Sequence, residues 1–361
     1  MADYLPGTAW LAVPDFQHNL FRELGIEPID AGGLHSTGDL LPAAGFHSTG
    51  DLLPARDTLP NSKTSFPVER LLPARVARFG DLVYRAGPAV SSFWHRTRLD
   101  KPFIAHFSSI REAADILRAL QRNWAHYPVA SFRRAELIRE KLPYINLKPR
   151  FFPYSVPRSP VGLWSLLDDH TLFASAETSS PFPAGEIQFE EDHVNPPSRA
   201  YLKMYEALAW VDYLGGSHAL PTNGSRCVDA GACPGGWTWV LDKLGATVKA
   251  IDRSELDARL MVKPNISFIK HDAFTLKPED FGPQDWVCSD VICYPPRLLE
   301  WVHKWLESGL CENFICTIKM QGEADHETTA AFAAIPGSTV VHLNANKNEL
   351  TWIRIKAAGE P

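Results

Sequence analysis

Four charged residues in the second half of the chain have the types and positions of an acid-base site. They alternate in charge along the sequence, and they are Lys203, Asp290, Lys319 and Glu349. Asp290 and Lys319 close apolar runs that predict buried strands, and Glu349 directly precedes another such run. Lysine and carboxylate side chains held together can remove or orient a proton on a weakly acidic hydroxyl group. Each residue alone is more often a surface charge, so the hypothesis requires the four to lie together.

A glycine-rich segment, Asp229–Trp237, predicts a ligand-binding turn between a strand and a helix. Its three glycines lack the Cβ atoms that would keep a ligand away from the backbone, and they are Gly231, Gly235 and Gly236. A dinucleotide-binding loop has the spacing G-x-G-x-x-G, but here Cys233 stands where the second glycine would be, and Pro234 follows it. The segment therefore disfavours a pyrophosphate ligand.

Two acidic residues after the next predicted strands extend this candidate ligand site. Asp252 ends the second strand, 23 residues after Asp229, where a carboxylate can accept both hydroxyls of a ribose. Asp272 follows the third strand and can accept a hydrogen bond from an adenine amino group. A glycine loop and two acidic strand ends, without ligands for phosphate, suit S-adenosylmethionine, a nucleoside whose reactive group is a sulfonium cation. The alternative is an ordinary α/β turn with surface acids.

Methylation of a ribose 2′-hydroxyl would use both groups of residues. This hydroxyl is a poor nucleophile with a very high pKa, so the reaction needs a side chain that removes or orients its proton. A lysine beside other cations in a partly desolvated site can have its pKa lowered towards neutrality. We therefore expect Lys319 to be the base, and the two carboxylates to hold that lysine and the substrate hydroxyl in line with the methyl carbon.

The elements that must position these residues are predicted by the pattern of the chain after about residue 196. Short apolar runs alternate there with helical patterns, which is typical of a parallel sheet covered by helices. We expect a doubly wound, Rossmann-like α/β domain with seven strands, at Arg226–Asp229, Thr247–Asp252, Ile266–Ile269, Trp286–Ser289, Asn313–Lys319, Thr339–Leu343 and Leu350–Ile355. The expected helices are Pro197–Leu214, Thr238–Leu244, Arg297–Leu306 and Glu327–Ala334.

The segment from Leu71 to Pro160 is basic, although the whole chain has a net charge of −6. It contains 16 Arg and Lys against 6 Asp and Glu, which leaves −16 for the rest. A helical pattern, Ser109–Trp124, and short β-like runs predict an α+β region. Basic and aromatic residues alternate after this helix, and we expect Arg133, Arg134 and Arg139 to bind RNA phosphates beside stacking surfaces. The alternative is a solvated helix face with core aromatics.

The first 70 residues begin with a strand-turn-helix pattern and then contain a duplication. Residues 35–43 and 47–55 both read His-Ser-Thr-Gly-Asp-Leu-Leu-Pro-Ala. Two copies are too few for a solenoid, so a duplicated loop is favoured over a binding array. We therefore expect three regions: 1–70 with this loop, 71–185 with the basic segment, and 186–361 with the α/β domain.

The composition argues against a membrane protein, a secreted protein and a metal site. The chain has 361 residues, and none of its apolar stretches approaches the roughly 20 residues that cross a bilayer. Its start has neither the basic residues nor the apolar run of a signal peptide. The six cysteines show no C-x-x-C spacing, and we expect buried thiols at Cys227, Cys233, Cys288, Cys293, Cys311 and Cys316. We expect a cytoplasmic protein without a membrane partner.

These motifs together resemble the FtsJ-like RNA ribose 2′-O-methyltransferases. The matching stretches are Pro197–Lys203, Asp229–Trp237, Val287–Asp290, Ile318-Lys319 and Asn348–Trp352. The resemblance covers Pro196 to about Lys356 and is greatest to the bacterial branch that methylates a cytidine ribose of large-subunit (23S) rRNA. Upstream it is weaker: Ala9–Phe16 is similar to the start of that branch, and residues 71–160 fall where its THUMP-like RNA-binding region would lie.

The resemblance implies roles for individual residues. The family's catalytic Lys-Asp-Lys-Glu tetrad would fall on Lys203, Asp290, Lys319 and Glu349. S-adenosylmethionine would be bound by Ser198, Gly231, Cys233, Pro234, Gly235, Gly236, Trp237, Asp252, Asp272 and Asp290. The substrate would be RNA, either 23S rRNA or a pre-ribosomal particle, and no metal would be required.

Two other functions remain open from the sequence. One is a non-catalytic RNA-binding or ribosome assembly factor that keeps a methyltransferase fold, although all four tetrad positions are filled. The other is a base methyltransferase, for which we would expect a catalytic cysteine pair or an Asn/Asp-Pro-Pro-aromatic motif after the fourth strand. The segment Asp290–Pro296, Asp-Val-Ile-Cys-Tyr-Pro-Pro, lacks that motif.

Overall fold

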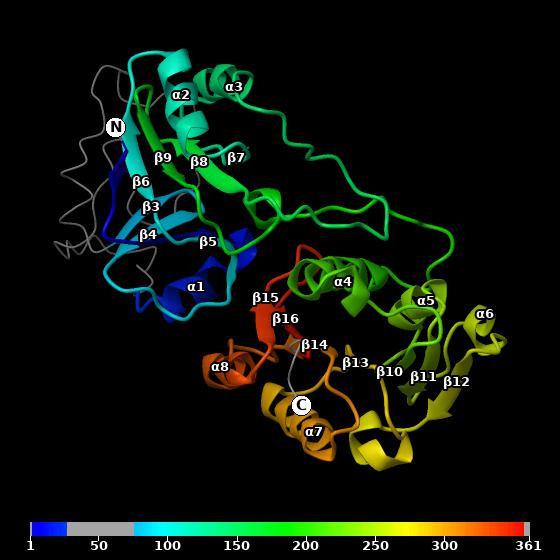
Figure 1. Ribbon diagram of the computed structural model, residues 1–361. Coiled ribbons are helices and arrows are strands. Elements are labelled where there is room, and N and C mark those ends of the chain that lie inside the picture. The colour runs from blue at the N-terminus through cyan, green and yellow to red at the C-terminus, as the bar shows by residue number, and fades with distance from the viewer. Residues whose placement is uncertain (1, 27–75, 357–361) are drawn as a thin grey trace. The chain divides into compact units, whose positions relative to one another are not determined.

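The computed structural model describes residues 2–26 and 76–356, and the chain divides into two compact units (Figure 1). One unit contains Met1–Lys148 and Arg158–Glu186, and the other contains Pro149–Pro157 and Ile187–Pro361. Residues 149–157, which belong to the basic segment, are thus part of the second unit. The duplicated loop lies outside the described residues, and the division into three regions stays a prediction. No helix in the described ranges is long and apolar enough to cross a membrane.

The first unit contains two sheets in which most neighbouring strands are antiparallel. The five-stranded sheet has the order β1 (Asp3–Tyr4), β6 (Phe103–His106), β9 (Thr171–Ser175), β8 (Gly162–Leu166) and β7 (Trp124–His126). The four-stranded sheet has the order β3 (Val76–Phe79), β4 (Leu82–Ala86), β2 (Gly7–Ala12) and β5 (His95–Leu99). Side chains from both sheets share one buried apolar cluster, which includes Leu11, Leu82 and Phe173. The expected α+β character of this region is present, whereas its THUMP-like identity stays a prediction.

Three helices accompany these sheets: α1 (Gln17–Glu23), α2 (Ile110–Leu120) and α3 (Phe132–Arg139). Helix α2 begins where the Ser109 side chain accepts a hydrogen bond from the backbone N–H of Glu112, a typical N-cap. The prediction that this helix continues to Trp124 is wrong, because the chain turns extended at Gln121 and Trp124 begins β7. The Trp124 indole nevertheless donates to the carbonyl of Leu117 at 2.9 Å, so it packs on the same helix from a strand.

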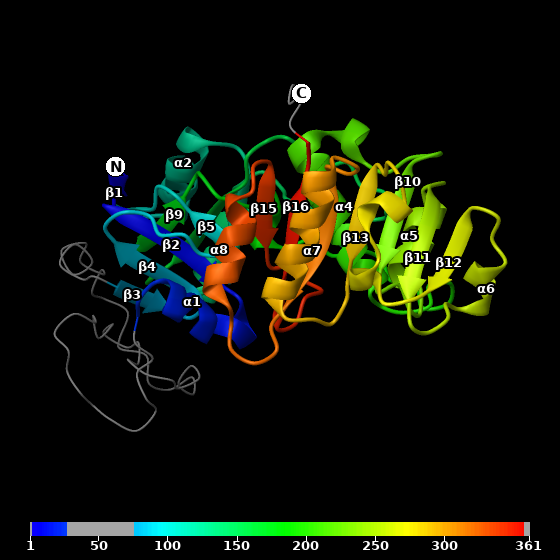
Figure 2. The ribbon, with the colours of Figure 1, turned by 90° about the horizontal axis from the view of Figure 1, so that it is seen from below.

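The second unit contains the expected seven-stranded α/β sheet (Figures 1 and 2). Its strand order is β12 (Ile266–Lys270), β11 (Thr247–Asp252), β10 (Arg226–Ala230), β13 (Trp286–Ser289), β14 (Phe314–Lys319), β16 (Glu349–Arg354) and β15 (Ser338–Val341). Helices α4 (Tyr201–Gly215) and α5 (Gly236–Lys243) cover one face, and α7 (Pro295–Ser308) and α8 (His326–Ala334) cover the other. The short helix α6 (Ala258–Met261) follows β11.

The prediction of a parallel sheet is correct for five strands and wrong for the region around β16. Strands β12, β11, β10, β13 and β14 are mutually parallel, but β16 is antiparallel to both of its neighbours, β14 and β15. Antiparallel neighbours place the start of one strand opposite the end of the other. The first residue of β16, Glu349, is therefore paired with the last residue of β14, Lys319. This reversal brings Glu349 to the edge where the parallel strands end.

Candidate active site

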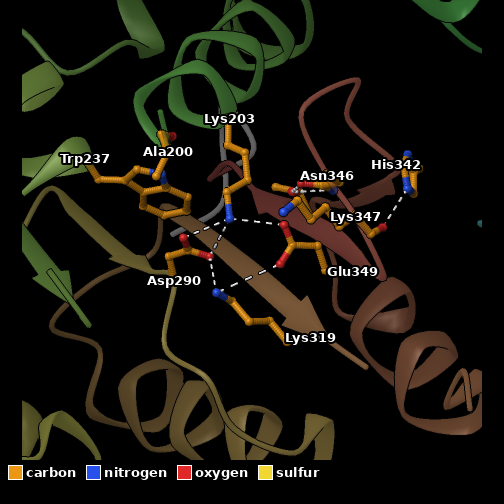
Figure 3. A network of polar contacts seen from close by, with 10 residues as sticks. Ala200, Lys203, Trp237, Asp290, Lys319, His342, Asn346, Lys347 and Glu349 are labelled. Carbon is orange, nitrogen blue, oxygen red and sulfur yellow. Dashed lines mark hydrogen bonds and ion pairs between the residues drawn. The ribbon is translucent and has the colours of Figure 1, made fainter. Parts of the chain in front are cut away.

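Lys203, Asp290, Lys319 and Glu349, which we call the tetrad, form one network of ion pairs (Figure 3). The Lys203 ammonium lies 2.8 Å from each carboxylate oxygen of Asp290 and 3.1 Å from Glu349 Oε1. Lys319 Nζ lies 2.9 Å from Asp290 Oδ1 and 3.9 Å from Glu349 Oε2. Each lysine thus faces both carboxylates, and the charges alternate around the network.

Three different types of element bring the tetrad together. Asp290 directly follows β13, and its backbone N–H donates to the carbonyl of Ala230, at the end of β10, at 3.2 Å. Lys319 and Glu349 are cross-strand partners of β14 and β16, so their side chains share one face of the sheet. Lys203 reaches them from the first turn of α4, which packs over that face. The site therefore requires the helix and the reversed strand to be in place.

Burial strengthens the interactions between the charges of the tetrad. Its four side chains are only 11 to 18% exposed, so little water screens their charges. Burial alone would lower the pKa of Lys203, but the charges and hydrogen bonds of Asp290 and Glu349 outweigh it and raise the pKa above its ordinary value. That residue stays a cation that holds the two carboxylates.

The glycine loop between β10 and α5 is closely packed at each glycine. Gly231 has a φ of +79°, and a Cβ there would lie 2.6 Å from a methyl carbon of Val291. A Cβ on Gly236 would lie 2.5 Å from the Ser198 hydroxyl oxygen. Gly235, with a φ of +117°, faces the Leu260 side chain in the same way. The loop needs glycine because its backbone touches the segments that carry Ser198 and Val291.

Asp252 is fixed by the glycine loop and by its own turn. One carboxylate oxygen accepts the backbone N–H of Cys233 at 3.0 Å, and the other accepts that of Ser254 at 2.9 Å. Gly231 and Ala232 also donate to the carbonyl of Ile251, at 2.9 and 3.2 Å. The carboxylate expected to receive a ribose therefore has a set orientation, and each of its oxygens keeps a further lone pair for a ligand.

Asp272 stands in a more crowded environment than the sequence indicated. Its carboxylate accepts the backbone N–H of Phe274 at 3.0 Å and pairs with Arg253 at 2.5 Å and Arg297 at 3.4 Å. Burial would raise the pKa of Asp272, but these partners outweigh it and lower the pKa below its ordinary value. A ligand amino group would meet this carboxylate beside two guanidinium groups.

Two buried oxygen atoms near the loop have no hydrogen-bond partner among the described residues. One is Asp229 Oδ1; the other oxygen of this carboxylate accepts from the Thr238 hydroxyl at 2.6 Å. Burial raises the pKa of Asp229 to about 7. The second atom is the Ser198 hydroxyl oxygen. Unsatisfied buried oxygens beside a backbone cradle fit a ligand with a polar, cationic end, as the amino-acid part of S-adenosylmethionine has.

The remaining predicted cofactor residues surround the same loop. The Trp237 indole donates to the carbonyl of Ala200 at 3.0 Å, which ties α5 to the start of α4 (Figure 3). The Pro234 carbonyl accepts the N–H of Asp257 at 2.9 Å. Cys233 is half-buried, and its thiol lies 3.3 Å from the carbonyl of Glu255, whereas the other five cysteines are buried. All six thiols are free, and the expectation of burial is confirmed for five of them and wrong for Cys233.

Glu206 is a positioning residue that the sequence analysis missed. It lies one turn after Lys203 on α4 and is 3% exposed. Both of its carboxylate oxygens accept the backbone N–H of Asn344, at 2.9 and 2.8 Å, in the loop that leads to Glu349. A glutamate among the mostly apolar residues of this helical stretch was the available signal. Glu206 thus holds the β15–β16 loop against the helix that carries Lys203.

The three predicted RNA-binding arginines lie on α3 of the first unit and differ in their surroundings. Arg133 is exposed, and Arg139 is 54% exposed and paired with Glu136 at 2.5 Å. The Arg134 guanidinium is half-buried and lies over the Phe107 ring, 5.4 Å from its centroid. Arg134 therefore has a packing role of its own, so Arg133 and Arg139 are the better candidates for contact with RNA.

Comparisons with known proteins find a family match for much of the second unit. Residues 196–333 match the family described as FtsJ-like methyltransferase. A protein of Xanthomonas oryzae named ribosomal RNA large subunit methyltransferase M is 30% identical over 239 residues, which is 65% of this chain. The match covers 64% of that relative, so the chain spans slightly less than two thirds of its length.

A second relative and a solved structure extend the comparison. A protein of the same name from Thauera aminoaromatica is 34% identical over 161 residues, or 42% of this chain and 43% of the relative. The structure of human methyltransferase-like protein 13 in complex with SAH is 14% identical, with a TM-score of 0.35, over 45% of this chain and 85% of that one.

Proposed function

We propose that the chain methylates a ribose 2′-hydroxyl of RNA, with S-adenosylmethionine as methyl donor, on the premise that residues 196–333 match the FtsJ-like methyltransferase family. The observation that carries the proposal is the tetrad, in which two lysines face two carboxylates at the strand edge that also holds the glycine loop. Relatives named ribosomal RNA large subunit methyltransferase M support 23S rRNA as the substrate.

The residues around the glycine loop can hold the cofactor. Gly231, Gly235 and Gly236 allow the loop to pack closely against its neighbours, and Asp252 beside it presents an oriented carboxylate to a ribose. The unpartnered oxygens of Asp229 and Ser198 suit the ammonium of the amino-acid part. When bound, S-adenosylmethionine would supply a methyl group attached to a positively charged sulfur. Loss of this methyl group would convert the sulfonium into a neutral thioether.

The tetrad would act on the proton of the substrate hydroxyl. The 2′-oxygen forms a bond to the methyl carbon while the carbon–sulfur bond breaks, and the hydroxyl proton must leave the oxygen. Lys319 accepts or directs this proton from its position 2.9 Å from Asp290. Lys203 remains charged and fixes Asp290 and Glu349, so that both carboxylates keep Lys319 in one orientation.

We further propose that the basic segment binds RNA without taking part in the reaction. Arg133 and Arg139 are exposed on α3 and can neutralise phosphates, with Arg134 packed beside them. The exposed side chains Phe132 and Tyr144 offer rings for base stacking in the same part of the chain. Such contacts position an RNA but leave the choice of the methylated atom to the tetrad.

The proposal is tested by mapping ribose methylation in large-subunit rRNA from cells with and without the gene. One 2′-O-methyl group should disappear with the gene and return when the wild-type chain is supplied. The purified protein should then transfer labelled methyl groups to RNA from the deleted cells. An unchanged map together with no transfer to any cellular RNA would favour the non-catalytic assembly factor.

A further inference from the structure

The loop between Asp290 and α7 exposes apolar side chains directly beside the tetrad. Ile292 is 78% exposed and Tyr294 is 64% exposed, and both follow Asp290 within four residues. At about 3.6 Å per residue, the Tyr294 backbone lies within about 14 Å of Asp290. Within the described chain, the Tyr294 ring has no hydrogen bond, ion pair or ring contact with another residue. This exposed side of the loop, which begins at the tetrad residue Asp290, is therefore accessible to a ligand.

The other residues of the loop hold it in place. Val291 lies against the glycine loop, where a Cβ on Gly231 would be 2.6 Å from its methyl carbon, and Cys293 is 6% exposed. Inward and outward side chains thus alternate, so that Ile292 and Tyr294 form the outer side. Pro295 and Pro296 follow at the start of α7 and restrict the backbone after Tyr294. A ligand would meet an ordered surface and lose little entropy in ordering it.

We propose that Ile292 and Tyr294 form a stacking platform for the base of the nucleotide whose ribose enters the tetrad. This inference rests on the proposed function, because a ribose 2′-hydroxyl at Asp290 and Lys319 must bring its own base to the surface around them. RNA bases that leave their stack are commonly received by aromatic side chains, and stacking accepts any base because every base has a π-face. The platform therefore positions the nucleotide but does not select its identity.

The chemistry of the platform favours a base over the sugar-phosphate backbone. Tyrosine and isoleucine present apolar surface and no positive charge, which phosphates would require. Arg297, three residues after Tyr294, is already paired with Asp272 at 3.4 Å. An RNA base offers the flat apolar surface that matches both exposed side chains.

The test compares substitutions of Tyr294 in methyl transfer to large-subunit rRNA from cells lacking the gene. Tyr294→Ala should raise KM for RNA by about 5- to 150-fold, the range given by the loss of one stacked base, and leave the Kd for S-adenosylmethionine unchanged. Tyr294→Phe should behave as wild type because it keeps the ring. Ile292→Ala should have a smaller effect in the same direction.

Matched controls separate the platform from general surface effects. Val262→Ala, at an 81% exposed residue of the second unit, and Tyr4→Ala, at a 57% exposed tyrosine of the first, should leave KM unchanged. Once the target is mapped, an RNA that lacks the base of that nucleotide should bind wild type and Tyr294→Ala equally, because the interaction is already absent.

Failure of the platform and failure of the proposed function give different results. The platform proposal is wrong if wild type transfers methyl groups and Tyr294→Ala keeps the wild-type KM. It is also wrong if Tyr294→Phe is as impaired as Tyr294→Ala. In both cases the proposed methyltransferase function is unaffected. If wild type transfers none, the proposed function fails. The platform is then still judged by fluorescence anisotropy with a short single-stranded RNA, where equal affinity of wild type and Tyr294→Ala would overturn it.

Discussion

The lysines of the tetrad and the arginines of α3 differ in how far water reaches them. Lys203 and Lys319 are 11% and 18% exposed, whereas Arg139 is 54% exposed. In the tetrad each charge is compensated by opposite charges, so removing one side chain leaves its buried partners with less compensation. On α3 the charges face solvent, where salt screens them and each contributes little. The first arrangement fixes geometry, and the second supplies a general attraction for phosphates.

The largest effect is expected from Asp290, which contacts both tetrad lysines. Asp290→Ala should lower methyl transfer by more than about 10²-fold, because it removes the carboxylate that lies closest to both buried ammonium groups. Single-turnover transfer to RNA from cells lacking the gene measures the rate. Asp290→Asn keeps the size of the side chain and serves as the control for folding; near-normal transfer by Asp290→Asn would show that the charge is unnecessary.

Lys319→Ala should lower the same rate by at least about 10²-fold, the usual scale for a positioned acid-base group, without abolishing cofactor binding. Lys319→Arg should fail to restore it, since arginine keeps the charge but does not give up its proton. Rescue by arginine would instead assign Lys319 a purely electrostatic role. Near-normal transfer by Lys319→Ala would turn attention to Lys203.

Glu349→Ala should be milder, with a loss of about tenfold, or about 1.4 kcal/mol in the activation free energy. Glu349 lies 3.9 Å from Lys319 and 3.1 Å from Lys203, and water can replace part of its orienting role. The comparison of Glu349→Ala with Asp290→Ala in one rate assay ranks the two carboxylates. A larger loss for Glu349→Ala would reverse their assigned roles.

Asp252→Ala tests the cofactor end of the site rather than the reaction. It should raise the Kd for S-adenosylmethionine by about tenfold, because the ribose hydroxyls lose one or two charge-assisted hydrogen bonds. Calorimetric titration measures this affinity, and Lys319→Ala provides a control in which it should be unchanged. Unaltered affinity in Asp252→Ala would place the ribose elsewhere.

The smallest effect on chemistry is expected from the exposed arginines. Replacing Arg133, Arg134 and Arg139 by alanine should weaken RNA binding, reduce the slope of log K against log salt by about 2, and leave cofactor affinity unchanged. The single variant Arg133→Ala controls for the packing of Arg134 on Phe107. If the triple variant keeps the wild-type salt slope, α3 is a solvated surface and the contrast with the tetrad loses its functional meaning.

Much of the second unit could be predicted because its strands are short buried runs with recognisable ends. Strands at Thr247–Asp252 and Trp286–Ser289 have the expected bounds, and the glycine loop lies between a strand and a helix as its spacing indicated. The direction of β16 could not be predicted, because an apolar run reads the same in a parallel or an antiparallel strand. A residue that precedes a parallel strand would lie at the opposite edge from the tetrad.

The electrostatics of the site and the role of Glu206 also depended on three-dimensional contacts. The pKa of Lys203 is raised by Asp290 and Glu349, which are 87 and 146 residues away in the sequence. Trp124 fits the helical repeat of apolar residues in the sequence, and its side chain does pack on α2. It does so from the neighbouring strand β7, however, and not as part of the helix. Long-range partners of this kind leave no trace in a local pattern.

The place of β16 in the sheet affects how the chain can fold during synthesis. This strand is synthesised after the other six but lies between β14 and β15, and β15 pairs with no other strand of the sheet. Until residues 349–354 leave the ribosome, the apolar strand β14 has an unpaired edge, which is a surface prone to aggregation. In a nascent chain the residues of the glycine loop are therefore present before Glu349 completes the tetrad. Premature termination before Glu349 should yield a chain that aggregates and cannot be rescued by cofactor.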